Sequence, residues 1–464
     1  MPYNFDELTE RRGTGSMKWD VPEGELPMWV ADMDFETAPE IREALMKRAA
    51  HGIFGYTVVP DAWREAVTGW WERRHGFVME KDWLVFTTGV VPAISSGVRK
   101  LTTVGENVLV QTPVYNIFFN SIRNNGRNII ENRLLYDGAG YRIDWEDLEK
   151  KLSDPQTTLM ILCNPHNPTG MLWTREELGR IGELCAANHV KIMSDEIHCD
   201  LTEPGYGYIP FASVSETCAQ NSITCIAPTK AFNLAGLQTA AVMVPNEELR
   251  HKMERALNTD EVAEPNAFAI EAAIAAFTKG EGWLDALREY LAENRKTVRK
   301  FLNDEIPEMS LVPAHATYLL WLDCRKIIVD ASELCRYLRK ETGLYLSAGM
   351  VYGGNGREFL RMNTACPKER LLDGLERLKQ GVKTYEEYQP KAVDDDRRVT
   401  MYYKKFRSLN LSALGLGALR LPMEKDNPNR IDREEGRKVI DQSLSSGINY
   451  IDTALPRHKI LWGS

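Results

Sequence analysis

Between residues 63 and 240, the chain alternates helical patterns with short apolar runs that end at turn-forming residues. These runs, each the length of a strand, lie at 83–89, 107–113, 158–165, 190–196 and 222–228. Buried strands separated by helices are typical of a mostly parallel sheet that is covered by helices. The pattern therefore predicts an α/β fold for this part of the chain.

The pattern becomes helical after this α/β part. Residues 265–280 end at a glycine that suits a helix C-terminus, and residues 283–302 repeat apolar positions at helical spacing. A mixed segment then extends to about residue 389. Its strand-like runs lie at 316–323 and 356–363. These patterns predict a second region that combines helices with a few strands.

The composition narrows the class of protein. The 464 residues, 43% hydrophobic and 27% charged, exclude a collagen-like, low-complexity or mostly disordered chain. A net charge of −9 argues against a protein that mainly holds nucleic acid, because phosphate binding needs a basic face. No apolar run approaches the roughly 18 residues of a membrane span, and the N-terminus lacks a signal-peptide core. Eight cysteines without a CxxC pair indicate neither a zinc ribbon nor a disulfide framework. We therefore expect a cytoplasmic protein.

Chemically informative residues follow the predicted strands, at the edge where an α/β sheet binds its ligand. Gly89 and Val90 begin a helix whose unpaired N–H groups can receive a phosphate, although most such junctions are plain connections. Asn167 begins the second of two Asn-Pro steps, which restrict the backbone and hold its side chain in place. A simple tight turn is the alternative interpretation of that loop.

Asp195 and Lys230 each end or follow a buried strand. A buried carboxylate is costly unless it meets a cation, so Asp195 either caps a helix or pairs with a charged ligand. A lysine in a dry site has a lowered pKa and can attack a carbonyl, whereas most isolated lysines extend to solvent. The specific signal is the ordered series Asn167, Asp195 and Lys230, in which each residue comes at or after the end of its own predicted strand.

Six motifs match one known family, and they are 26–35 (LPMWVADMDF), 55–57 (GYT), 164–170 (NPHNPTG), 195–198 (DEIH), 229–238 (TKAFNLAGLQ) and 360–363 (LRMN). On these motifs, residues 1 to about 389 resemble the aminotransferase class I/II superfamily of fold type I, whose enzymes depend on pyridoxal 5′-phosphate (PLP). Within it, the chain is most similar to the cystathionine β-lyase branch, the MalY/PatB family.

The resemblance implies a division into domains. It implies a large PLP-binding domain at 51–285, with a mostly parallel seven-stranded sheet, and a smaller α+β domain at 286–389. An N-terminal segment, 1–50, would join the small domain. A homodimer is expected, because this fold builds its site from two subunits.

The resemblance also assigns roles in the site. Lys230 would hold PLP covalently and later take the α-proton of the amino acid, and Asp195 would pair with the protonated pyridine nitrogen. The other expected contacts are Asn167 at the ring oxygen, His198 beside it, Tyr115 on the ring face, Gly89, Val90 and Thr229 at the phosphate, Tyr56 from the second subunit, and Arg361 at the substrate carboxylate. No metal would be needed.

Two positions depart from the usual aminotransferase pattern. Gln238 stands where a phosphate-binding arginine is common, and His198 where a tyrosine is common; both are similar to the lyase branch. The implied reaction is α,β-elimination on a cysteine thioether such as cystathionine, which releases a thiol (homocysteine), pyruvate and ammonia. The alternatives are a PLP-dependent aminotransferase, or a regulator that kept the fold.

The C-terminal part differs from the rest. Residues 390–400 are charged and poor in apolar residues, as in a linker. Residues 401–464 resemble the start of an aldo-keto reductase, a (β/α)8 barrel, including Asp452 at that family's active-site position. A complete barrel takes about 250 residues, and the tyrosine expected soon after Asp452 is missing. We therefore predict a partial barrel fragment that is not a working reductase.

Overall fold

A computed structural model describes residues 3–388 and, further along, 403–406, 409–412, 416–417, 423–424, 427–445, 448 and 451–452. The chain divides into two compact units, Met1–Glu387 and Tyr388–Ser464. The predicted linker at 390–400 lies outside the described residues. Among the described residues, no helix combines the length and the apolar character needed to cross a membrane.

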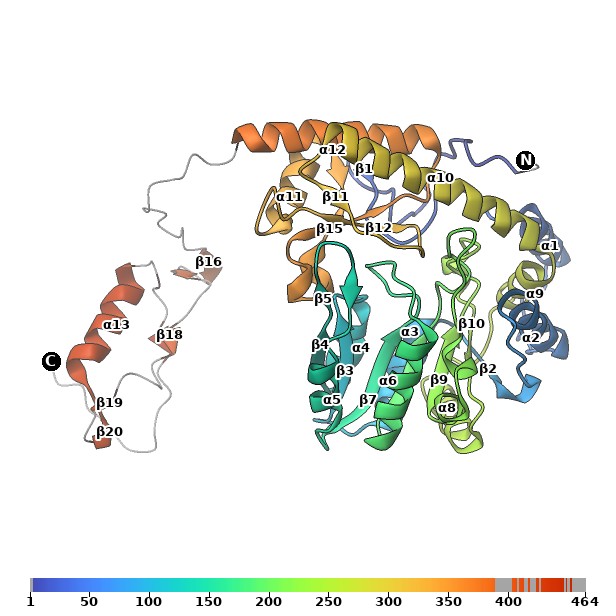
Figure 1. Cartoon of the computed structure of the whole chain (residues 1–464), viewed down its shortest axis with the longest axis horizontal. Helices are drawn as coiled ribbons and strands as arrows, with labels where there is room; N and C mark the ends of the chain where they lie inside the picture. Colours follow the sequence, from blue (N-terminus) through green and yellow to red (C-terminus); the bar gives the residue numbers. More distant parts are fainter. Residues whose placement is uncertain are drawn as a thin grey trace. The chain divides into compact units, whose positions relative to one another are not determined.

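The first unit is built on a seven-stranded sheet (Figure 1). In spatial order its strands are β2 (Leu84–Thr87), β10 (Ala240–Met243), β9 (Ser222–Ile226), β8 (Lys191–Asp195), β7 (Thr157–Cys163), β3 (Asn107–Thr112) and β4 (Asn128–Arg133). Strand β10 is antiparallel to both neighbours, and all other pairs are parallel. The predicted mostly parallel seven-stranded sheet is confirmed.

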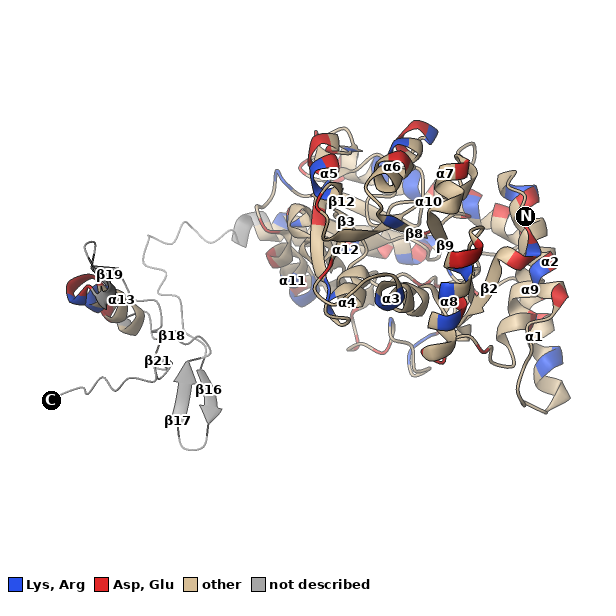
Figure 2. Ribbon diagram, turned by 90° about the horizontal axis from the view of Figure 1, so that it is seen from below, with Lys and Arg blue, Asp and Glu red and all other residues tan. Residues whose placement is uncertain are grey.

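Alternate residues of the central strands face opposite sides of the sheet. Leu159 and Ile161 of β7 pack against one helix layer, and Met160 and Leu162 against the other. Figure 2 shows the two layers on opposite sides of the sheet. The first layer contains α3 (Val90–Leu101), α4 (Ile117–Arg123) and α8 (Glu247–Thr259), and the second contains α5 (Trp145–Leu152), α6 (Arg175–Ala187) and α7 (Glu216–Gln220). Because both faces are covered, these strands read as continuous apolar runs.

A third group of helices packs beside strand β2. It consists of α1 (Pro39–His51), α2 (Asp61–His75) and α9 (Ala269–Lys279). Trp63, Trp70 and Trp71 of α2 are almost completely buried in the cluster that these helices form. Helix α10 (Glu281–Glu305) follows and leads away from the large sheet (Figure 1).

A second, antiparallel sheet of four strands lies beyond α10. Its order is β11 (Ser310–Leu311), β12 (Leu319–Asp323), β15 (Phe359–Asn363) and β14 (Ser347–Ala348), and it packs with α11 (Ala331–Thr342) and α12 (Lys368–Tyr388). The N-terminal strand β1 (Leu26–Pro27) pairs with β13 (Leu344–Tyr345) in this region. The hairpin β5 (Leu135–Tyr136) and β6 (Tyr141–Arg142) completes the unit's strands. The domain boundaries at 51 and 286 stay predictions.

The second unit holds three strand pairs and one helix among its described residues. Strands β16 (Tyr403–Phe406) and β17 (Leu409–Ser412) are antiparallel, as are β19 (Met423–Glu424) and β20 (Asn427–Ile431). Strand β18 (Leu416–Gly417) is parallel to β21 (Ile451–Asp452), and α13 (Arg433–Ser445) lies between them in sequence. A parallel pair connected through a helix is the repeating element of a (β/α) barrel. The likeness to a barrel fragment stays a prediction.

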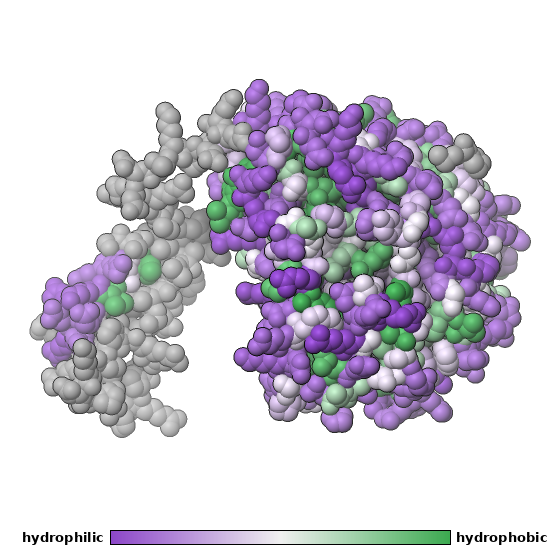
Figure 3. Space-filling model, viewed as in Figure 1, coloured by the Kyte–Doolittle hydropathy of each residue, from purple (hydrophilic) through white to green (hydrophobic). Residues whose placement is uncertain are grey.

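The surface of the first unit is largely hydrophilic on the face shown in Figure 3, with apolar residues scattered over it. One run of exposed apolar side chains lies between α1 and α2. It contains Ile53, Phe54, Tyr56 and Val58, and Tyr56 is fully exposed.

Candidate active site

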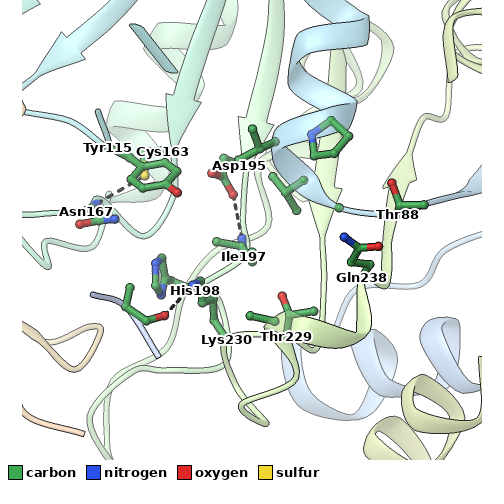
Figure 4. A pocket seen from close by; sticks show the side chains of 16 residues that line it. Thr88, Tyr115, Cys163, Asn167, Asp195, Ile197, His198, Thr229, Lys230 and Gln238 are labelled. Atoms are coloured by element: carbon green, nitrogen blue, oxygen red, sulfur yellow. Dashed lines mark hydrogen bonds between the residues drawn. The ribbon is translucent and has the colours of Figure 1, made fainter. Parts of the chain in front are cut away.

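A cavity of about 260 Å³ lies where β2, β7, β8 and β9 end (Figure 4). The carboxyl ends of parallel strands meet at one edge of a sheet, so residues that follow different strands come together there. Eight of the predicted site residues line the cavity, namely Gly89, Val90, Tyr115, Asn167, Asp195, His198, Thr229 and Lys230. Gln238, which we noted as a departure from the aminotransferase pattern, also lines it.

Two predicted residues do not line this cavity. Arg361 of β15 is buried beside it, and its guanidinium donates to Asn167 Oδ1 at 3.2 Å and to the Trp29 carbonyl at 2.8 Å. Its Nε has no hydrogen-bond partner. Tyr56 is fully exposed on this chain, and its predicted role as a contribution from a second subunit stays a prediction.

Lys230 follows β9 and its Nζ donates to the Ala31 carbonyl at 2.6 Å. Burial lowers the pKa of Lys230 from 10.5 to about 8; nearby Arg361 lowers it further, while Asp32 and Asp195 oppose the change. About a tenth of the amine is therefore uncharged at pH 7, far more than for an ordinary lysine. An uncharged amine is the form that attacks a carbonyl or accepts a proton from carbon.

Asp195 ends β8 and is almost completely buried. Burial raises the pKa of Asp195 to about 7, with a smaller rise from Glu196, while the Ile197 amide, which donates to its Oδ1 at 3.1 Å, and Lys230 lower it. A buried carboxyl of this kind stores an unfavourable energy that a cationic ligand relieves. The side chain therefore suits a protonated ring nitrogen.

Three residues surround the position between Lys230 and Asp195. Burial raises the pKa of Tyr115 to about 12, so its ring stays neutral and can stack on a flat ligand. Burial, together with Lys230 and Arg361, lowers the pKa of His198 to about 3, so the imidazole is neutral, and its Nδ1 has no partner. Because Arg361 occupies Asn167 Oδ1, the amide nitrogen of Asn167 is the group left for a ligand.

The far end of the cavity offers neutral donors. Helix α3 begins at Val90 after Gly89, and its first-turn N–H groups and positive dipole favour an anion. Thr229 and Gln238 line the same cavity. Among the described residues that line it, Lys230 is the only lysine or arginine, so a phosphate here would meet hydrogen bonds and a helix dipole rather than an arginine. Together with the orphaned His198 nitrogen, these groups fit PLP.

The backbone of residues 29–32 also contacts the site residues, which the sequence patterns did not predict. The Ala31 carbonyl accepts from Lys230 and from the Tyr318 hydroxyl at 3.2 Å. Asn363 Nδ2 donates to the Val30 and Asp32 carbonyls, each at 2.6 Å. Every residue has a backbone carbonyl, so a sequence does not show which carbonyls reach a site. The only indication was that this segment belongs to one of the six family motifs.

One group of possible metal ligands was found in the described part of the chain, and it lies outside this cavity. It consists of His75, Cys199 and Asp200. The Asp200 carboxylate already accepts from Trp70 Nε1 at 3.0 Å and pairs with His75 Nε2 at 3.0 Å, which explains the cluster without an ion. That the reaction needs no metal stays a prediction.

The sequence model of one family, described as aminotransferase class I and II, matches residues 26–378. The chain belongs to this family. The matched range contains every predicted site residue of the first unit and ends before the C-terminal tail. Membership confirms the resemblance drawn from the six motifs.

Individual members of the family are closely similar. Cystathionine β-lyase PatB of Bacillus subtilis (strain 168) is 45% identical over 383 residues, which cover 81% of this chain and 99% of PatB. Protein MalY of Escherichia coli (strain K12) is 33% identical over 80% of this chain and 97% of MalY. The crystal structure of cystalysin from Treponema denticola, which contains a pyridoxal 5′-phosphate cofactor, has a TM-score of 0.80 and 32% identity, and the match covers 83% of this chain and 100% of cystalysin.

Proposed function

We propose that this protein is a PLP-dependent carbon–sulfur β-lyase that, with the uptake of one water molecule, cleaves cysteine thioethers such as cystathionine into a thiol, pyruvate and ammonia. The observation that carries the proposal is the Lys230 amine, with its pKa lowered to about 8, in one cavity with Asp195. The similarity to PatB, which is named a cystathionine β-lyase, supports the reaction, and that to cystalysin supports the cofactor.

PLP would supply an electron sink that stabilises negative charge at the substrate Cα. Lys230 would hold the coenzyme covalently, and its uncharged Nζ would accept the proton from the substrate Cα. The same ammonium is then placed to return a proton to the departing sulfur. Arg361 binds the substrate carboxylate with a planar two-donor fork, and its unpartnered Nε supplies one of the donors.

The remaining residues hold the coenzyme in place. Asp195 keeps the pyridine nitrogen protonated, while Asn167 and His198 donate toward the ring oxygen, the histidine in its neutral form. Tyr115 covers one ring face. The amides of Gly89 and Val90 and the Thr229 hydroxyl would donate hydrogen bonds to the phosphate of the coenzyme.

A homodimer is part of the proposal. The exposed apolar run of Ile53, Phe54, Tyr56 and Val58 would be an unusual surface for a monomer and suits contact with a second copy. In such a dimer Tyr56 would approach the phosphate of the other subunit. A cytoplasmic location is also proposed, and it is supported by the eight cysteines, which are all buried and free.

The cofactor assignment has a direct test. The purified protein is expected to show a visible absorbance band that borohydride bleaches, with the added mass located on Lys230 by peptide analysis. A colourless protein, or label on another lysine, would refute the assignment.

The reaction has a second test. Incubation with L-cystathionine is expected to release pyruvate and free thiol in equal amounts. Amino transfer from glutamate without thiol release would instead identify an aminotransferase. A bound coenzyme with neither activity would favour a regulator on this fold.

A further inference from the structure

A second carboxylate lies directly beside Asp195, on the side of the chain away from the cavity. Glu196 is completely buried and accepts hydrogen bonds from four groups. Ser194 Oγ (2.8 Å), the Phe211 amide (3.0 Å) and Asn164 Nδ2 (3.4 Å) donate to Oε1, and the Tyr208 hydroxyl donates to Oε2. A buried carboxylate is tolerated when it is bonded in this way.

The donors come from three separate segments. Ser194 belongs to the end of β8, Asn164 directly follows β7, and Tyr208 and Phe211 belong to a later segment that leads into a short 3-10 helix. The Asn164 amide also donates to the Asp195 carbonyl at 2.9 Å, and its side chain to the Ile209 carbonyl at 2.9 Å. Glu196 is therefore the point at which the ends of β7 and β8 are joined to each other and to this later segment.

Both ring-holding residues of the proposed site extend from these two strand ends. Asp195 precedes Glu196 in the chain, and Asn167 lies three residues after Asn164 in the rigid loop. We propose that Glu196 is a positioning residue, whose carboxylate fixes the separation of Asn167 and Asp195 and adds a negative charge that keeps the coenzyme's ring nitrogen protonated.

The effect of the Glu196 charge depends on the groups around Asp195 and Glu196. Burial is the main reason why the pKa of Asp195 is raised, and Glu196 adds to it. The titratable and polar groups that face the two carboxylates are Lys230, Tyr115, Cys163, Cys199, Cys225, Tyr208, Ser194, Asn164 and the backbone amides of Ile197 and Phe211. Burial raises the pKa of Glu196, and the hydrogen bonds from Tyr208, Phe211, Ser194 and Asn164 oppose that rise. Trp71 Nε1 donates to the Tyr208 oxygen, which leaves the tyrosine proton for Glu196.

The test uses two variants that change the charge and preserve the shape. Glu196→Gln removes the negative charge, and Tyr208→Phe removes the donor that stabilises it. With coenzyme labelled with ¹⁵N in the ring, NMR follows the pH at which the ring nitrogen of the bound coenzyme loses its proton. We expect this midpoint to fall by roughly half a pH unit or more in both variants, and the coenzyme dissociation constant to rise several-fold.

Glu203→Gln is the matched control. Glu203 is also a largely buried carboxylate, but it pairs with Arg295 and His315 instead. The control is expected to lose stability without moving the midpoint, whereas an equal shift in the control would overturn the inference. An unchanged midpoint in both test variants would do the same, and Tyr208→Phe decides the matter if Glu196→Gln does not fold.

The inference rests on the proposed PLP site, and the two can fail separately. If the parent protein carries no coenzyme on Lys230, the proposed function is wrong. If the parent carries it and neither variant moves the midpoint, only the role of Glu196 is wrong.

Discussion

Replacing Lys230 by methionine is expected to abolish the activity and yet stabilise the coenzyme-free protein. The side chain keeps most of its volume but no longer brings a charge into the cavity. The pKa of Lys230 is about 8 in the folded protein and 10.5 in the unfolded chain. At 1.36 kcal/mol for each pH unit, the charged lysine therefore destabilises the folded protein by about 3 kcal/mol. The loss of the hydrogen bond to Ala31 destabilises the variant by roughly 1 kcal/mol. The net expectation is a gain of about 2 kcal/mol in the free energy of unfolding at neutral pH.

The gain in the free energy of unfolding is expected to decrease as the pH rises. The folded protein gives up the Lys230 proton more readily than the unfolded chain, so the parent's penalty is fully present below its folded pKa of about 8. Between that pH and the unfolded value of 10.5, the unfolded chain holds more protons and the parent becomes more stable as the pH rises. The advantage of Lys230→Met is therefore expected to shrink close to zero by about pH 10.

Urea unfolding of coenzyme-free parent and variant, at neutral and alkaline pH, measures this difference. The matched control is Lys252→Met, because Lys252 is an exposed lysine of α8 that pairs with Glu248; its effect is expected to stay within about 0.5 kcal/mol. A Lys230→Met variant that is less stable than the parent at neutral pH would refute the reasoning. A gain that persists unchanged at alkaline pH would refute it as well.

Three further predictions concern the site and the tail. Arg361→Lys loses the two-donor fork, and steady-state kinetics are expected to show a rise in KM of roughly tenfold or more with bound coenzyme retained; an unchanged KM would exclude Arg361 as the carboxylate ligand. Gln238→Arg adds a cation at the phosphate end, so equilibrium dialysis is expected to show tighter coenzyme binding, and weaker binding would show that this end does not receive the phosphate. Deleting residues 391–464 is expected to leave thiol release from L-cystathionine unchanged, and its loss would mean that the tail is integral to the enzyme.

The large sheet was predictable where the strands are apolar on both faces. Strands β7 and β8 read as continuous apolar runs because helices cover both sides. Strand β4 was not predicted, since its sequence, Asn128–Arg133, is largely polar and lies at the edge of the sheet. Strand β10 has only four residues, and nothing in so short a run shows that it is antiparallel to its neighbours.

The candidate site divides in a similar way. Lys230, Asp195 and Asn167 could be singled out because each is a polar residue that follows an apolar strand. The role of Glu196 could not, since it depends on donors from segments up to 32 residues away in sequence. The contact of Arg361 with Asn167 spans 194 residues and connects β15 to the loop after β7. A sequence pattern does not show a contact between such distant residues.

The segment at 29–32 has a consequence for biosynthesis. It is held by Asn363, which lies more than 330 positions later in the chain. A ribosome makes the N-terminal end first, so the carbonyl that contacts Lys230 cannot be fixed until nearly all of the first unit has been translated. We therefore expect coenzyme loading to require chains finished through residue 363, because a shorter product lacks the side chain that holds this segment.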